Sequence, residues 1–506
     1  MKTCYPLLLS PFLFLSACAF TPAVTPSHWS VESVSRYASG YPRGTEIVSV
    51  QQSTHRAAVS ISSTGEVDVL DISRPDHQIR RIARFNLGLR EGEELTSVAF
   101  HPSLDLFAAV IDAGVKPGRL EVRSAKTGKL IDRLIVGFGP DAVVFAPDGK
   151  TAVIANEGED FFYQPDSARF FKPESSLSIV RLDSSGHFTD HKNLKLANIS
   201  PTECAVRRRG NRLLEREIDW NGDGKINETL DFDRNGTVEN KKVLLGSFEA
   251  QDVFGTETTG EKNLMIPVKS YSTALQEPES IAISPNGRKA YVTLQEGNTV
   301  AFVDLIDERV TGYRDLGTSQ HAADILSDGK ITFDRQLKGL REPDGIALAA
   351  KGLYFVTADE GDTEATSSAQ PLSGGRTVSV FDAETGILLG DTGNQLDEVA
   401  FTNQVYPDRR SGKKGAEPEM LVSLELDDVP YVAVGMERAA SVELISLADP
   451  YHPKVVSLGK IGGEGEKSPE GIAHFIVNGE HYLLTANEMN GTVECFKIVR
   501  KNTAPP

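Results

Sequence analysis

The chain has 506 residues, of which 40% are hydrophobic and 25% are charged, and it carries a net charge of −18. This composition excludes a globally disordered chain and a polytopic membrane protein. The acidic excess repels phosphate backbones, so it argues against a nucleic-acid-binding function. The length exceeds the size at which a single compact core stops growing, which leaves several domains or a repeat architecture.

The N-terminus has the composition of an export signal. Residues 1–17 carry one charge, at Lys2, followed by an apolar run that is too short to span a bilayer. The run ends in Leu15-Ser-Ala-Cys18, which resembles a bacterial lipobox. We therefore predict a lipoprotein signal peptide over residues 1–17. An ordinary secretory signal with an incidental cysteine is the alternative.

Cleavage at this site would leave Cys18 as a lipidated first residue that anchors the chain to a membrane. The residue after it is Ala19 and not an aspartate, which in Gram-negative envelopes indicates delivery to the outer membrane. Residues 18–40 are rich in Pro, Ser, Thr and Ala and are predicted to form a tether. The expected location is therefore the bacterial cell envelope, lipid-anchored in the outer membrane.

One sequence phrase recurs seven times between residues 41 and 500. Each copy has an acidic or Pro-acidic start, a strand of alternating small and apolar residues, a turn and further apolar strands. Turns such as Pro147-Asp-Gly149 and Pro285-Asn-Gly287 supply the positive φ that hairpins need. The pattern predicts an all-β fold, a seven-bladed β-propeller whose radial closure protects the strand edges. An open array of β-sandwiches is the alternative, and the even repetition favours closure.

Residues 184–276 interrupt the repeat between the third and fourth copies and are predicted to form an insertion. Two stretches within it resemble the oxygen-rich loops that bind calcium. Leu230 and Lys242 stand where the closing acidic residues belong, and no flanking helices are evident. We predict that calcium binds there and orders the insertion, with a solvated turn as the alternative. The predicted ligands are Asp219, Asn221, Asp223 and Asn227 in the first stretch and Asp231, Asp233 and Asn235 in the second.

Acidic residues also recur at two equivalent places in the repeat. Because equivalent positions of a propeller form rings about its axis, we expect these side chains at one mouth of the central channel. Crowded carboxylates need cations, hydrogen bonds or raised pKa values, and their oxygens suit calcium or magnesium. A purely structural role, in which each carboxylate caps backbone N–H groups of the neighbouring blade, is the favoured interpretation, and a cation- or ligand-binding mouth is the alternative. The candidates are Asp141, Glu279, Asp344, Glu419 and Glu470 at the start of the first strand, and Glu157, Glu296, Glu360, Glu437 and Glu488 after the second.

Taken in order, the phrases resemble the choice-of-anchor I family of exported bacterial propeller-like proteins. The phrases that carry the resemblance include Gly139-Pro-Asp, Glu277-Pro-Glu, Glu417-Pro-Glu419 and Pro469-Glu-Gly471, and Tyr291-Val-Thr also resembles the YVTN propeller repeats. The family usually has an acidic pair where this chain has Gly412 and Lys413, so we expect no metal site from that loop. The resemblance implies an exported propeller and does not define a reaction.

The sequence contains no Gly-x-Ser-x-Gly elbow, His-Glu-x-x-His helix or phosphate-binding glycine loop. We therefore favour a non-catalytic, surface-anchored propeller that binds calcium and an extracytoplasmic ligand or protein partner, and no nucleic acid. The alternative is a metal-dependent hydrolase, phosphoesterase-like or lactonase-like. It would use the carboxylates at the channel mouth to hold a cation that activates water.

Overall fold

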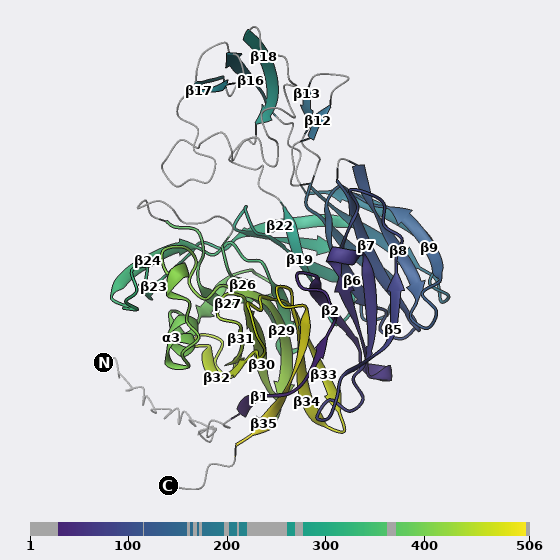
Figure 1. Cartoon of the computed structure of the whole chain (residues 1–506), viewed down its shortest axis with the longest axis vertical. Coiled ribbons are helices and arrows are strands. Elements are labelled where there is room, and N and C mark those ends of the chain that lie inside the picture. The colour runs from purple at the N-terminus through teal and green to yellow at the C-terminus, as the bar shows by residue number, and fades with distance from the viewer. Residues whose placement is uncertain are drawn as a thin grey trace, which may run out of the picture.

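Seven four-stranded antiparallel sheets form the blades of a β-propeller. Figure 1 shows the strands of these sheets coloured along the chain. The computed structural model describes residues 29–114, 116–158, 175–196, 277–361 and 371–501, and the backbone of five short strands outside these ranges. The predicted all-β fold with seven blades is confirmed. None of the helices in these residues is long and apolar enough to cross a membrane.

The first four blades follow one another along the chain, each from its innermost to its outermost strand. Blade 1 contains β2 (Thr45–Gln51), β3 (Arg56–Ile61), β4 (Glu66–Asp71) and β5 (Arg80–Asn86). Blade 2 contains β6 (Glu94–Phe100), β7 (Leu106–Ala113), β8 (Lys116–Ser124) and β9 (Leu130–Ile135). Blade 3 contains β10 (Pro140–Phe145), β11 (Thr151–Asn156), β14 (Ser176–Leu182) and β15 (Phe188–Lys195). Blade 4 contains β19 (Pro278–Ile283), β20 (Lys289–Leu294), β21 (Thr299–Asp304) and β22 (Arg309–Asp315).

The last three blades have the same order, except that the final blade takes its outermost strand from the start of the chain. Blade 5 contains β25 (Ile346–Ala349), β26 (Tyr354–Asp359), β27 (Thr377–Asp382) and β28 (Leu388–Asp391). Blade 6 contains β29 (Pro418–Leu426), β30 (Val429–Met436), β31 (Ser441–Ser446) and β32 (Lys454–Lys460). Blade 7 contains β33 (Pro469–Val477), β34 (Glu480–Asn487), β35 (Thr492–Arg500) and β1 (Trp29–Ala38).

Additional elements lie between the blades or within their loops. The hairpin of β23 (Thr318–Ala323) and β24 (Arg335–Leu340) separates blades 4 and 5, and α3 (Gln395–Thr402) precedes blade 6. Short 3-10 helices occur at Gln52–Thr54, Ser62–Thr64, Ala350–Gly352 and Asp408–Arg410. The remaining strands are β12 (Phe162–Gln164), β13 (Arg169–Phe171), β16 (Thr202–Arg209), β17 (Arg212–Asp219) and β18 (Glu261–Val268).

The hydrophobic core consists of clusters that each join two neighbouring blades. For example, Val122 of blade 2 and Ile154 of blade 3 belong to one cluster. Another cluster joins Val48 of blade 1 to Phe475 of blade 7, and it closes the ring. Buried apolar side chains therefore join each blade to the next around the ring, and their burial is the main favourable term in folding.

Two boundaries expected from the sequence are wrong. The predicted tether of residues 18–40 ends early, because Trp29–Ala38 form β1 and pair with β35. Val31 on this strand is only 5% exposed and packs in a cluster with Phe496. The predicted insertion of residues 184–276 likewise starts later, because Phe188–Lys195 form the outermost strand of blade 3.

Candidate metal centre at the channel mouth

An acidic residue stands at the entry to the innermost strand of every blade. These seven residues are Glu46, Glu94, Asp141, Glu279, Asp344, Glu419 and Glu470. In five of the blades the pairing with the second strand is irregular at this acid, for instance between Pro140 and Ala142. In blade 2 the irregularity lies at Thr96, two residues after Glu94. Such bulges turn a side chain away from the direction that the regular alternation of the strand would give it. We call this set the mouth ring.

The backbone enters the mouth ring through a sharp turn. Two residues ahead of the acid, Gly139, Glu342, Glu417 and Ser468 have positive φ values between 43° and 58°. A proline follows each of them and fixes the next φ. Left-handed backbone at a non-glycine residue is unfavourable and concentrates at functional sites.

The second set of acidic residues follows the second strand of five blades. Antiparallel pairing brings the end of this strand to the start of the first, as in the pairs Pro140–Asn156 and Pro469–Asn487. Both sets therefore lie at the same end of the blades. The second set consists of Glu157, Glu296, Glu360, Glu437 and Glu488.

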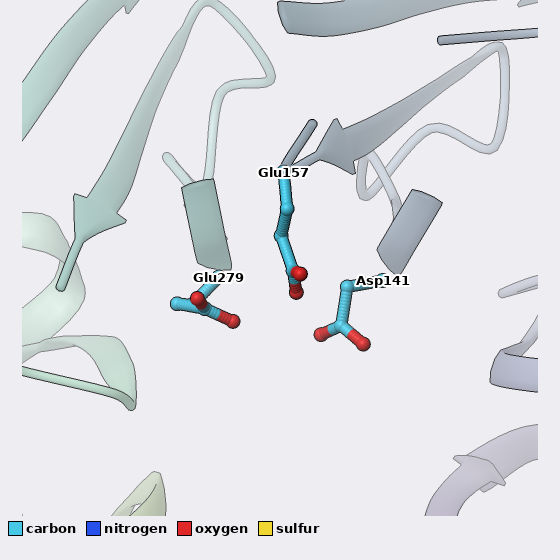
Figure 2. Close-up of side chains that lie close together, drawn as sticks. All are labelled: Asp141, Glu157 and Glu279. Atoms are coloured by element: carbon cyan, nitrogen blue, oxygen red, sulfur yellow. The ribbon is translucent and has the colours of Figure 1, made fainter. Parts of the chain in front are cut away.

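Blades 3 and 4 bring three of the predicted carboxylates together. Asp141 enters β10, Glu157 follows β11 and Glu279 enters β19, and their carboxylates point toward one another (Figure 2). One oxygen from each lies within 4.8 Å of the others. Burial, followed by the carboxylates of Glu157, Asp141 and Asp344, raises the pKa of Glu279 well above its ordinary value. We call these three residues the blade 3–4 cluster.

A second group of carboxylates lies in blades 5 and 6. Asp344, Glu360 and Glu419 form one set of three within 4.8 Å, and Glu360, Glu417 and Glu437 form another. Burial raises the pKa of Glu360 to about 8, although Lys414 acts in the opposite direction. Burial raises the pKa of Glu437 to about 7 against the effect of Arg438. We call these five carboxylates the blade 5–6 cluster.

The other predicted carboxylates border these two groups. Glu470 interacts electrostatically with Glu437, Asp344 and Glu488, and burial is the main reason that its pKa is raised. Within the part of the chain that the structure describes, Glu296, Glu470 and Glu488 belong to no set of three within ligand distance.

Three members of the site were missed by sequence reasoning. Glu46 and Glu94 open the first strands of blades 1 and 2, but no proline precedes them as in the later blades. Burial and the carboxylate of Asp141 raise the pKa of Glu46 to about 8, so it faces the same mouth. Glu417 is part of the repeat phrase Glu417-Pro-Glu419 but was not among the predicted carboxylates. Strand register would have identified Glu46, whereas the equivalent position in blade 2 is Thr96 and Glu94 lies two residues before it.

Beneath the mouth ring the channel contains a cavity of about 350 Å³. Each blade contributes its innermost strand to the wall. Representative lining residues, one from each blade, are Ile47, Ser97, Asp141, Ser280, Ile346, Met420 and Gly471. The cavity therefore joins an acidic mouth to a wall of mixed apolar and polar surface.

The predicted calcium ligands of the insertion cannot be placed in this site. The side chains of Asp219, Asn221, Asp223, Asn227, Asp231, Asp233 and Asn235 lie outside the described residues, as does the predicted lipidation site Cys18. These predictions stay predictions.

Comparison with known proteins gives a family. The sequence profile of the choice-of-anchor I domain matches residues 46–370 and 367–450. No curated protein matches the chain significantly.

Among solved structures, the β-propeller domain of Cps50 (Swd1) from Myceliophteria thermophila aligns with a TM-score of 0.48 and 8% identity over 91% of this chain and 97% of that one. Hydrazine synthase from Kuenenia stuttgartiensis aligns with a TM-score of 0.48 and 11% identity over 92% and 100%. Sqt1 from Saccharomyces cerevisiae aligns with a TM-score of 0.47 and 9% identity over 93% and 100%.

Proposed function

The chain belongs to the choice-of-anchor I domain family, whose members are exported and associated with the cell surface, and from this premise we propose a cation-dependent binding module. The propeller holds a divalent cation, calcium, at the channel mouth, and the bound ion forms part of the surface that receives an extracytoplasmic ligand or protein.

The blade 3–4 cluster is the observation that carries this proposal. Three carboxylates from three separate strands converge within 4.8 Å of one another. Carboxylate oxygens are the ligands that calcium prefers, and its coordination is flexible enough to accept an irregular set. A bound cation would also offset the repulsion that raises the pKa of Glu279.

The placement of the long connections between blades also indicates that the mouth face is the binding face. Since first strands start at the mouth and neighbouring strands are antiparallel, every link between blades lies at the mouth end. The β23–β24 hairpin and α3 are on such links, and so are Leu196 and Glu277, the described ends of the insertion. Loops on a rigid scaffold commonly carry binding function.

The proposal also includes the signal peptide and the lipid anchor. We propose that residues 1–17 are a lipoprotein signal peptide and that Cys18 carries the lipid that holds the module in the outer membrane. The insertion binds its own calcium through the Asp/Asn stretches and is ordered by it. The net charge of −18 favours a partner other than nucleic acid.

Calcium titration of the full mature chain tests the proposal. To isolate the mouth, Asp219, Asp223, Asp231 and Asp233 are first changed to Asn, and Asp141→Asn with Glu279→Gln is then added. We expect the added pair to weaken calcium affinity at the mouth by at least about 100-fold, because two of three ligand carboxylates become neutral. Isothermal titration calorimetry measures the change.

Glu384→Gln is the matched control, because this carboxylate is 80% exposed and lies outside the cluster. The control should bind calcium as the parent does. Equal affinities for the parent and the Asp141/Glu279 variant would refute calcium binding by the blade 3–4 cluster.

A metal-dependent hydrolase is the second candidate, and one observation favours it. Glu360 and Glu437 have pKa values of about 8 and about 7, which suit proton transfer near neutral pH. A screen of the mature protein against phosphoesters and lactones, with calcium and with EDTA, separates the two candidates. Calcium-dependent turnover that the Asp141/Glu279 variant loses would establish the hydrolase.

A further inference from the structure

The two carboxylate clusters differ in their cationic neighbours. The loop that leads into blade 6 carries Arg409, Arg410, Lys413 and Lys414. Two of these side chains reach the blade 5–6 cluster: Arg410 Nε lies 2.5 Å from Glu417 Oε1, and Lys414 Nζ lies 2.6 Å from Glu360 Oε1. The protein's own side chains therefore place positive charge beside the blade 5–6 cluster.

Lys414 is the most deeply placed of these groups. The residue is 8% exposed, and its Nζ also donates to the carbonyl of Gly361 at 2.9 Å. Glu417 Oε2 lies 4.0 Å away. An ammonium that contacts two carboxylates and a carbonyl uses the kind of oxygen set that would otherwise hold a hard metal cation.

The path of the lysine side chain is built into the fold. A Cβ placed on Gly361 would lie 3.0 Å from Lys414 Cδ, and one placed on Gly374 would lie 3.5 Å from Lys414 Cγ. Both glycines have positive φ, at 104° and 87°. Their missing side chains leave a slot through which the lysine stem reaches the mouth.

Arg438 forms ion pairs with two carboxylates of this cluster. Arg438 Nε lies 3.3 Å from Glu417 Oε2, and Arg438 NH1 lies 2.7 Å from Glu437 Oε1. The Gln295 amide donates to Glu360 Oε2 at 3.1 Å, on the carboxylate whose other oxygen accepts from Lys414. By contrast, the charged groups that act most on Glu279 of the blade 3–4 cluster are all carboxylates.

We infer that Lys414 is a built-in counter-cation that occupies the blade 5–6 cluster and excludes metal ions from it. This inference rests on the proposed function and deepens it, because it assigns the metal to blades 3 and 4 and gives the mouth one ion. Removal of the ammonium alone should open a second site for a divalent cation, since Asp344, Glu360 and Glu419 already lie within 4.8 Å.

The test uses Lys414→Met in the full mature chain with both Asp/Asn stretches of the insertion neutralised by Asp219→Asn, Asp223→Asn, Asp231→Asn and Asp233→Asn. Bound calcium per chain is counted by equilibrium dialysis and elemental analysis. We expect one ion in the parent and two in Lys414→Met. In EDTA the Tm of Lys414→Met should fall below that of the parent, and millimolar calcium should restore it, because calcium takes over the charge of the ammonium.

Lys414→Arg is the conservative control, because it keeps the positive charge and should gain no ion. Unchanged stoichiometry in a folded Lys414→Met protein would overturn the inference, and so would a Lys414→Met protein that calcium fails to restore. Failure of the proposed function gives a different result, namely a parent without a mouth ion and one ion in Lys414→Met.

Discussion

Replacement of Arg341 by methionine should lower the free energy of unfolding by about 3–5 kcal/mol, the usual cost of breaking a buried ion pair. The Arg341 side chain is 1% exposed, and its guanidinium contacts Asp359 Oδ2 at 3.2 Å and Asp391 Oδ2 at 2.8 Å. It also donates to the carbonyls of Leu316 and Thr318. Without it, the fully buried Asp359 would lose its cation. Chemical denaturation at neutral pH measures the loss.

The same change should disturb the mouth, because Arg341 lies three residues before Asp344 in the chain. Arg309→Met is the control, since Arg309 is 60% exposed and should change stability by less than about 0.5 kcal/mol. The double variant with Asp359→Asn should recover part of the lost stability, because no buried charge is then left unpaired. A loss below about 1 kcal/mol in Arg341→Met would contradict the structural role.

Glu443→Gln should stabilise the protein near pH 8, because the glutamine carries no charge that burial would penalise. Both carboxylate oxygens of Glu443 are buried without a hydrogen-bond partner in the described residues. Burial, followed by the carboxylate of Asp397, raises the pKa of Glu443 well above its ordinary value. Since the raised pKa favours the protonated folded state, its contribution is complete below the unfolded value and is lost as the pH rises.

The corresponding positions of other blades explain why Glu443 is unusual and provide the control. Across the sheet, Asp68, Glu121 and Glu494 pair with an arginine on the outermost strand, whereas Glu443 pairs with Leu458. Burial acts to raise the pKa of Glu121, but hydrogen bonds from Arg119 and Arg123 outweigh it and hold that pKa below its ordinary value.

Glu121→Gln should therefore destabilise the protein. The loss should be full above about pH 4.5, where the carboxylate is ionised in both states, and should shrink as the pH falls below that value and the native carboxylate takes up a proton. Unfolding measured at pH 4.5 and at pH 8 distinguishes the two variants by sign. A pH-independent difference between Glu443→Gln and the parent would show that Glu443 takes up no additional proton on folding.

The blades and most of the mouth ring were predictable because repetition places equivalent residues at equivalent radii. Asp141 and Glu279 were assigned to one mouth from that argument alone. The tether boundary was not predictable, because β1 has the Ser-rich composition of a linker and is a strand only through its pairing with β35. The position of Lys414 depends on the path of an irregular loop, which no periodic pattern encodes.

The pairing of β1 has a consequence for how the propeller is oriented. Ala38 pairs with Thr492 at the mouth end of blade 7, and Trp29 pairs with Arg500 at the opposite end. Any attachment upstream of Trp29 would hold the molecule by its back, with the acidic mouth presented outward to the surroundings. Tension along that attachment would act first on the Trp29–Arg500 pair, at the back end of the seam between β1 and β35.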